Sequence, residues 1–260
     1  MKKLIPVILC CVLLFNSIGM ASASEVTLDT YRTSDGVLVD SSVDTELATD
    51  IPDEILDVLQ DYHDPILVSA SVTFTDFETN SQTRASMPTS DFSLSVYAFE
   101  LGALDKANDG VHGDAFLFLA MGRWYVDPFY EFTDCMGITW SDDFTLYHTS
   151  GYVRTNLSED GSEYVDRRDT MTLKTISPEQ GFAYNVDLLV NTREDSIVLM
   201  GKVYKADSTG SANVCASYGH VIVTAGNVSV TFAEGEPLGM TVPFTSAIES
   251  AIPSYDYFNY

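Results

Sequence analysis

The stretch at 68–77, VSASVTFTDF, alternates apolar and hydroxyl side chains along most of its length. In an extended chain Val68, Ala70, Val72 and Phe74 would face one side, and the serines and threonines between them would face the other. A period of two residues predicts an antiparallel strand with one face against a core and one face toward water. The stretch therefore indicates an all-β protein built mainly from antiparallel strands.

Strand-like segments continue from this stretch toward the end of the chain. Residues 115–121, AFLFLAM, are apolar throughout, which predicts a strand that is buried on both faces. Clusters of Gly, Asn, Asp and Pro separate the segments and indicate turns. The other expected strands lie at 91–101, 170–176, 195–206, 219–225 and 227–233. Many short strands between turns favour a sandwich or a related two-sheet fold.

One short helix is expected on the N-terminal side of the strands, near residues 51–62. The apolar positions that recur at helical spacing are Ile51, Ile55, Val58, Leu59 and Tyr62. Asp50 is placed to cap the start of this helix, and Pro65 prevents its continuation. Its opposite, acidic face is expected to be solvated.

The first 23 residues have the pattern of a secretory signal peptide. A basic start precedes an apolar run at 4–14, and a small-residue cleavage site, ASA, follows at 21–23. The run is short for a membrane-spanning helix, so a retained anchor is less favoured. After this signal peptide (1–23), we expect a polar N-terminal arm at 24–50 and a single β-rich domain at 51–260.

The composition is strongly acidic, with 38 Asp and Glu against 13 Lys and Arg and a net charge of −25. Such a surface repels nucleic acid, which is not expected as a partner. It also repels anionic lipid headgroups unless a divalent cation bridges them. No second long apolar run is visible, which predicts no integral membrane segment once the signal is removed. We therefore expect a secreted, extracellular protein whose ligand is a glycan or another protein.

No local spacing typical of an enzyme is visible. The chain lacks a G-x-S-x-G elbow, an H-E-x-x-H motif and a glycine-rich phosphate loop. His220 shares a strand face with Tyr218, which favours a packed histidine with one hydrogen bond. A glycosidase needs only two carboxylates, and their separation leaves no trace in the sequence.

Three functions therefore stand as hypotheses, and the absent spacings favour the one that is not an enzyme. The first is a non-enzymatic extracellular domain that binds a surface, a glycan or a protein. The second is an extracellular carbohydrate-active hydrolase with paired carboxylates. The third is a secreted toxin or bacteriocin-like effector, in which alternating strands could rearrange into a barrel.

Residues 122–134, GRWYVDPFYEFTD, mix aromatic rings with carboxylates. Flat sugar faces stack on rings while sugar hydroxyls need acceptors, so the segment is a candidate ligand site. Ordinary strand packing is the alternative, and it is favoured because aromatic residues are common in strands. The candidate ligand-binding residues are Trp124, Tyr125, Asp127, Tyr130 and Glu131.

Residues 105–116, DKANDGVHGDAF, gather oxygen donors between two apolar runs. An EF-hand is excluded because Ala107 and Phe116 occupy two of its ligand positions. A different calcium loop would use Asp105, Asn108, Asp109 and Asp114. The favoured alternative is a hairpin turn made by Asn-Asp-Gly, with the other polar residues in water. Calcium is the one cofactor that the sequence suggests.

Two cysteines, Cys135 and Cys215, follow the signal segment. Outside the cytoplasm such a pair can form a disulfide. Two separate buried thiols, acting as small apolar residues, are the alternative. The sequence does not show whether the two sulfurs lie within bonding distance, so both interpretations stay open.

Three segments in the C-terminal part of the chain occur together in a recognisable order. They are 143–155 (DFTLYHTSGYVRT), 178–189 (PEQGFAYNVDLL) and 201–232, which begins GKVYKADSTG. Together they resemble uncharacterised secreted, β-rich proteins of Gram-positive bacteria. The resemblance implies export and a β fold, and it carries no activity and no catalytic residue with it.

Overall fold

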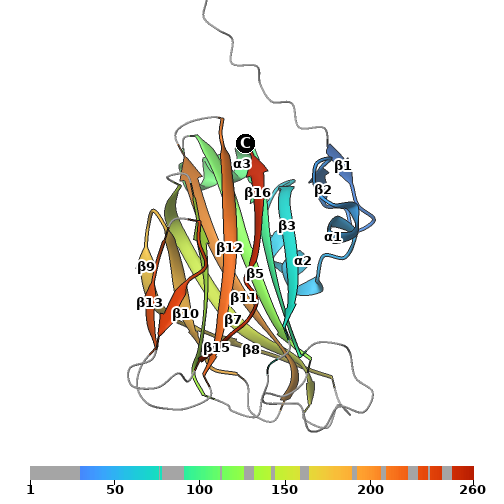
Figure 1. Cartoon of the computed structure of the whole chain (residues 1–260). Coiled ribbons are helices and arrows are strands. Elements are labelled where there is room, and N and C mark those ends of the chain that lie inside the picture. Colours follow the sequence, from blue (N-terminus) through green and yellow to red (C-terminus); the bar gives the residue numbers. More distant parts are fainter. Residues whose placement is uncertain are drawn as a thin grey trace, which may run out of the picture.

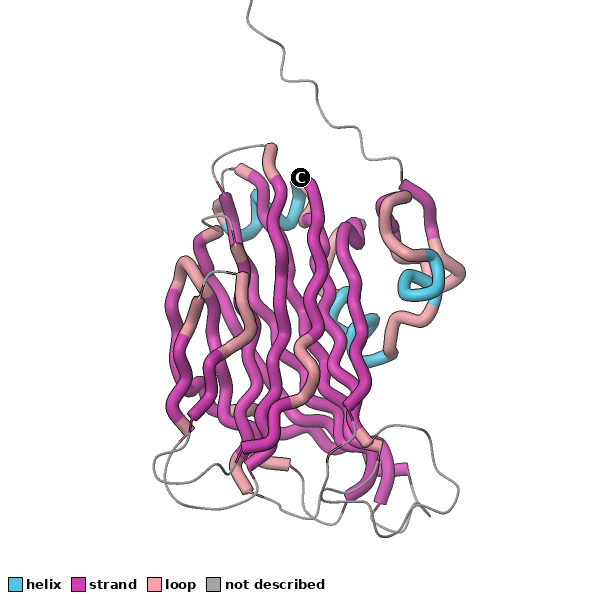
Figure 2. The backbone as a smooth tube through the Cα atoms, in the orientation of Figure 1, coloured by secondary structure: helices cyan, strands magenta, loops and turns pink. Residues whose placement is uncertain are grey.

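The structure is a computed structural model in which two sheets pack face to face as a sandwich (Figures 1 and 2). The residues that it describes are 30–75, 77, 91–111, 113–125, 132–141, 144–158, 164–188, 192–205, 209–221, 228–233, 235–241 and 248–260. Strands dominate these residues and most pair in antiparallel fashion, which confirms the expected all-β, two-sheet fold. The predicted signal peptide lies outside the described residues.

The larger sheet has eight strands in the order β1-β2-β3-β4-β5-β11-β7-β8. Its neighbours pair in antiparallel fashion except for β2 and β3, which run parallel. The bounds are β1 (Thr30–Arg32), β2 (Leu38–Asp40), β3 (Ile66–Thr75), β4 (Phe92–Glu100), β5 (Asp114–Trp124), β7 (Thr145–Ser158), β8 (Tyr164–Thr170) and β11 (Thr192–Lys205).

The smaller sheet has the order β15-β12-β6-β10-β9, and β16 also pairs with β12. Two further strands, β13 (Ser229–Thr231) and β14 (Gly239–Thr241), form a separate two-stranded ribbon within the described residues. The strands of the smaller sheet are β6 (Asp134–Trp140), β9 (Thr172–Ser177), β10 (Gly181–Val186), β12 (Ser211–Val221), β15 (Ile248–Ser250) and β16 (Ser254–Asn259).

The alternating stretch of the sequence forms most of β3. Its apolar residues, however, do not all face the same side of the sheet as expected. A β-bulge lies directly after Leu67 and changes the phase of the alternation. As a result Val68 packs between the two sheets, whereas Leu67 and Ala70 pack on the other side of the larger sheet. Phe74 is 54% exposed. The prediction that Val68, Ala70, Val72 and Phe74 share one buried face is therefore wrong.

Strand β5 separates two apolar cores, and its residues Ala115–Met121 are all buried. Phe116 and Phe118 face the core between the sheets, where they contact the rings of Phe144 and Phe258. The alternate residues of β5 face a second core on the outer side of the larger sheet. The expected burial of this strand on both faces is confirmed.

Short helices cover the second core. The helices α1 (Thr45–Thr49) and α2 (Asp53–Leu59) lie against the outer face of the larger sheet, beside β3 (Figure 1). Helix α2 confirms the helix expected near 51–62, although it is shorter. Its N-cap is Pro52 rather than Asp50, so Asp50 does not serve as the cap.

The described part of the expected polar arm, residues 30–50, is packed against the sheet. It forms β1, β2 and α1. Val39, Val43 and Ala48 are buried in the second core, so this segment supplies apolar contacts as well as polar surface. The Asp44 side chain caps α1 by accepting a hydrogen bond from Glu46 N at 2.9 Å.

Candidate functional site

The segment proposed as a calcium loop begins with a helix, not with a hairpin turn. Residues Ala103–Asp109 form α3, and Gly110 ends it with a left-handed φ of 68°. Glycine adopts this conformation without a side-chain penalty, which is why it often ends helices. The expected Asn-Asp-Gly hairpin turn is therefore wrong, because these residues terminate α3.

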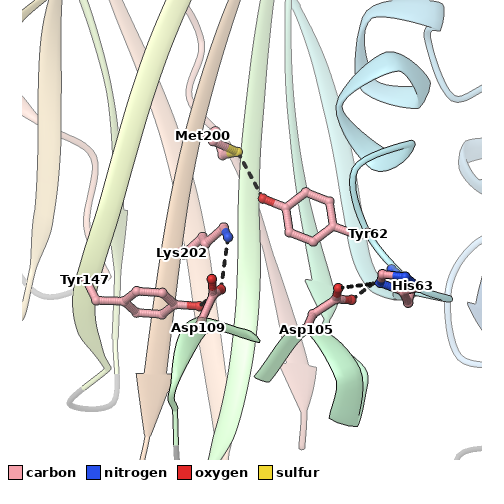
Figure 3. Close-up of polar contacts among 7 residues, drawn as sticks. All are labelled: Tyr62, His63, Asp105, Asp109, Tyr147, Met200 and Lys202. Carbon is pink, nitrogen blue, oxygen red and sulfur yellow. Dashed lines mark hydrogen bonds and ion pairs between the residues drawn. The ribbon is translucent and has the colours of Figure 1, made fainter. Parts of the chain in front are cut away.

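Two of the four proposed calcium donors, Asp105 and Asp109, point to different partners (Figure 3). Asp105 accepts hydrogen bonds from His63 N at 2.9 Å and contacts His63 Nδ1 at 3.0 Å. Asp109 is paired with Lys202 Nζ at 2.9 Å. Asp114 lies 3.5 Å from Lys106 Nζ, and Asn108 is exposed.

No group of three or more Asp, Glu, His or Cys side chains is placed to share one metal ion in the described part of the chain. Both oxygens of Asp105 contact nitrogens of His63, and Oδ2 of Asp109 accepts a hydrogen bond from Lys202 Nζ. The calcium loop stays a prediction, and the geometry of these donors gives it no support.

Thermal unfolding gives a direct test of the calcium loop. We expect the midpoint to be the same in excess EDTA and in millimolar calcium, because Asp105, Asp109 and Asp114 are each paired with other side chains. A ligand at a hundred times its dissociation constant would add about 2.7 kcal/mol, which is a visible shift. A calcium-specific rise that magnesium does not reproduce and that Asp109→Ala removes would contradict this expectation.

The contacts of this region form a joint between three parts of the fold, which we call the α3 joint. It contains Tyr62 and His63 after α2, Asp105 and Asp109 on α3, and Tyr147, Met200 and Lys202 on the larger sheet (Figure 3). The Tyr147 hydroxyl donates to Asp109 at 3.0 Å, and Lys202 Nζ lies 5.1 Å from the centre of the Tyr62 ring. Burial raises the pKa of both tyrosines. These contacts explain how the helices are held to the sheet.

The aromatic segment proposed as a ligand site is only partly within the described residues. Trp124 is 2% exposed, and its Nε1 donates a hydrogen bond to the Tyr218 hydroxyl at 3.1 Å. Tyr125 shares a hydrogen bond with Ser93 Oγ at 3.1 Å. The ring of Trp124 belongs to the core and is not available to stack on a sugar. Asp127, Tyr130 and Glu131 lie outside the described residues.

A buried polar centre forms around Asp134, at the start of β6. Its carboxylate accepts hydrogen bonds from the Tyr218 hydroxyl and from Val221 N, the latter at 2.7 Å, and lies 3.1 Å from His220 Nδ1. Asp134, Tyr218 and His220 are each at most 1% exposed. We call these three residues the Asp134 centre.

The sequence predicts that Tyr218 and His220 share one strand face and that His220 is a packed histidine with one hydrogen bond. The structure agrees, and it supplies the partner that the sequence did not reveal. Asp134 lies 86 residues from His220 along the chain, and β6 and β12 become neighbours only in the folded sheet. No local signal could have joined them.

The environment of the Asp134 centre fits a structural role. Burial raises the pKa of Asp134, while the hydrogen bonds from His220, Tyr218 and Val221 oppose that rise. The ring of Phe77 lies 5.7 Å from His220, and that of Trp124 lies 5.2 Å from it. With aromatic rings packed on the histidine, the centre presents no surface to a substrate.

The cysteines are separate buried thiols, so the proposed disulfide between Cys135 and Cys215 is not formed. They lie on neighbouring strands, where Cys135 pairs with Gly219 and Cys215 pairs with Thr139. Four ladder positions correspond to roughly 13 Å, which is beyond the reach of a disulfide.

An open groove of about 840 Å³ lies on the outer side of the smaller sheet, and we call it the β9–β13 groove. Its lining combines hydroxyl, amide and charged groups with apolar side chains. The lining residues are Phe132, Thr133, Thr172, Leu173, Lys174, Thr175, Asn185, Asp187, Val221, Val228, Ser229 and Val230.

The groove exists because the β13–β14 ribbon covers only part of the sheet. Strand β9 ends the smaller sheet and pairs with β10, while β13 pairs with β14. Gly137 lets the ribbon approach, since a Cβ atom there would lie 2.4 Å from Leu238 Cδ1. The uncovered strip beside β9 forms the groove.

Polar side chains in the groove are held in place by one another. Lys174 Nζ donates to Asn185 Oδ1 at 3.1 Å. Thr133 Oγ1 donates to Asp187 Oδ1 at 2.6 Å. Leu173 is 43% exposed, so an apolar side chain is also available to a ligand. Thr133 falls in the segment 122–134 that the sequence indicates as a candidate ligand site. The other groove residues come from separate segments, so no local pattern predicts them together.

Comparisons with known proteins give no family for this chain. No family model and no curated protein matches it. Three similar solved structures are the KRT10-binding region domain of the pneumococcal serine-rich repeat protein PsrP, a pore-forming protein and the Clostridium perfringens delta-toxin.

The first has 9% identity and a TM-score of 0.33, covering 58% of this chain and 85% of its own. The pore-forming protein has 7% identity and a TM-score of 0.31, covering 74% and 89%. The delta-toxin has 6% identity and a TM-score of 0.27, covering 74% and 92%. Scores this low do not establish a shared fold, so they assign no function. Among the described helices, none is long and apolar enough to cross a membrane.

Proposed function

We propose that the protein is an extracellular, non-enzymatic binding module whose β9–β13 groove takes an extended segment of a partner polypeptide. The observation that supports this is the pair of strands along the groove. Each of them, β9 and β13, has a single strand partner in the described structure, so each leaves one backbone edge unpaired. An extended peptide can add to such an edge through main-chain hydrogen bonds.

The side chains of the groove suit an extended peptide. Its backbone amides need donors and acceptors, which the threonine hydroxyls and Asn185 supply. Alternate side chains of a bound strand need pockets of different character, and Leu173 offers an apolar contact beside the charged Lys174. Both kinds of contact lie within one groove.

The groove does not favour a hydrolase. Among the described residues that line it, Asp187 is the single carboxylate, and Thr133 already donates to it. A glycosidase needs two carboxylates facing the scissile bond. The binding role is therefore the better supported of the two.

Panning a random-peptide display library on the immobilised protein tests the proposal. We expect enriched peptides whose binding falls at least about tenfold in Thr175→Arg, because a large side chain would fill the groove. Ile176→Arg is the matched control, since it adds the same charge one position along β9 at a residue outside the groove lining.

Three results would contradict the proposal. One is the absence of any enriched peptide, and another is equal loss of binding in both arginine variants. The third is a glycan-array ligand whose binding Thr175→Arg abolishes, which would make the groove a sugar site.

A further inference from the structure

The two sheets meet along one side of the sandwich, where β16 lies beside β3 (Figure 1). Side-chain hydroxyls join them there. Thr73 Oγ1 donates to Ile252 O at 2.7 Å, and Thr75 Oγ1 accepts from Ile252 N at 2.8 Å. Ser69 Oγ donates to Asp256 Oδ2 at 3.2 Å. These bonds fix β16 against β3.

Exposed apolar side chains gather along this junction. Of the seven large apolar side chains that are exposed among the described residues, four lie here. They are Phe74 (54% exposed), Ile252 (55%), Tyr255 (55%) and Tyr257 (67%), and we call them the seam strip. A cluster of exposed apolar side chains commonly marks an interaction surface.

The two tyrosines of the seam strip are presented by a firmly held strand. Tyr255 and Tyr257 are two residues apart on β16, so they project from the same face, with ring centres 6.4 Å apart. Phe258 and Tyr260 are buried in the core at the end of the chain. The rings of the strip therefore face solvent from a rigid base.

The charge around the seam strip is negative. Residues 66–75 and 248–260 contain Glu249 and Asp256 but no lysine, arginine or histidine. The whole chain has a net charge of −25. The overall charge and the absence of a cation in these two segments favour a cationic partner and disfavour a second copy of this chain.

The aromatic chemistry also favours a cation. Ring faces carry partial negative charge and attract ammonium and guanidinium groups. The fold already uses such contacts, since the Arg168 guanidinium carbon lies 4.1 Å from the centre of the Tyr152 ring.

We infer that the seam strip binds a segment of a partner protein rich in lysine or arginine, whose cationic side chains lie against Tyr255 and Tyr257. This surface is separate from the β9–β13 groove, because β9 and β16 lie on opposite sides of β12 in the smaller sheet. The two sites use different residues and can be tested independently.

The test uses a fluorescein-labelled, N-acetylated octa-arginine peptide and fluorescence anisotropy at physiological salt. The double variant Tyr255→Leu/Tyr257→Leu keeps the charge and most of the apolar area but removes the rings, and we expect it to bind about tenfold more weakly. Tyr255→Phe/Tyr257→Phe keeps the ring faces, and we expect affinity within about twofold of the original.

Two controls separate the strip from general acidity. An octa-citrulline peptide, which is uncharged, is expected not to bind. Leu104→Ala/Ile176→Ala removes two exposed apolar side chains elsewhere and is expected to leave affinity unchanged. Unchanged thermal midpoints establish that all variants are folded.

Any of four results would overturn the inference. These are no binding of octa-arginine, equal binding by the leucine variant, equal weakening in the phenylalanine and leucine variants, or a dimer in analytical ultracentrifugation that the leucine variant dissolves. The last would make a second copy the occupant of the strip.

Discussion

Replacing Asp134 with alanine is expected to lower the free energy of unfolding by about 3–5 kcal/mol. The carboxylate accepts hydrogen bonds from the Tyr218 hydroxyl and from Val221 N, and it faces His220 Nδ1. All of these groups lie in the core, where water cannot replace the lost acceptor. A buried donor without a partner carries its full desolvation cost.

Urea denaturation of the two proteins measures this difference directly. Asp187→Ala serves as the control, because Asp187 is an exposed aspartate whose hydrogen-bond donor among the described residues is Thr133. We expect that control to change stability by no more than about 0.5 kcal/mol. A loss below about 1 kcal/mol for Asp134→Ala would show that the Asp134 centre does not stabilise the fold.

Stability is also expected to fall steeply as the pH rises above about 9, because several buried groups must stay neutral in the folded protein. Burial raises the pKa of Tyr97 to about 12 and that of Tyr218 well above its usual value. Burial likewise raises the pKa of the Cys135 thiol to about 12 and that of Cys215 to about 11.

Stability falls with rising pH because the folded state holds its protons to higher pH than the unfolded state does. In the unfolded chain thiols ionise near pH 8.5 and tyrosines near pH 10, whereas in the folded chain these groups keep their protons to higher pH. The unfolded state is therefore favoured as the pH rises above the pKa values that these groups have in the unfolded chain. Each group lowers stability by about 1.4 kcal/mol per pH unit until its folded pKa is reached.

Urea midpoints between pH 8 and pH 11 would show this fall. Absorbance at 295 nm, which reports tyrosinate, should rise for the buried rings together with unfolding. The variant Tyr97→Phe removes one such group, so its stability should decline less steeply above pH 10. A constant midpoint up to pH 11 would contradict the burial of these groups.

Features that depend on local patterning could be predicted from the sequence. The apolar run Ala115–Met121 predicted a strand buried on both faces, and the helical spacing near 51–62 predicted α2. The all-β class followed from alternation and turns. Each of these signals lies within one short segment, where periodicity directly reflects burial.

Features that depend on pairing between distant segments could not be predicted. The bulge after Leu67 depends on how β3 registers with β4, and it reversed the expected sides of β3. The distance between Cys135 and Cys215 depends on the ladder between β6 and β12. The β9–β13 groove likewise needs the β13–β14 ribbon to lie on a sheet that other segments build.

The burial of both faces of β5 affects how its register with the neighbouring strands β4 and β11 is determined. Most strands resist slipping by one residue because the slip would expose apolar side chains to water. In β5 both sides are apolar, so polarity gives no such protection. A slip would instead exchange Phe116 and Phe118 with Leu117 and Leu119. The correct register is then favoured by the shapes of the side chains. After a slip, the rings of Phe116 and Phe118, which pack against Phe144 and Phe258, would have to fit in the second core beneath the helices.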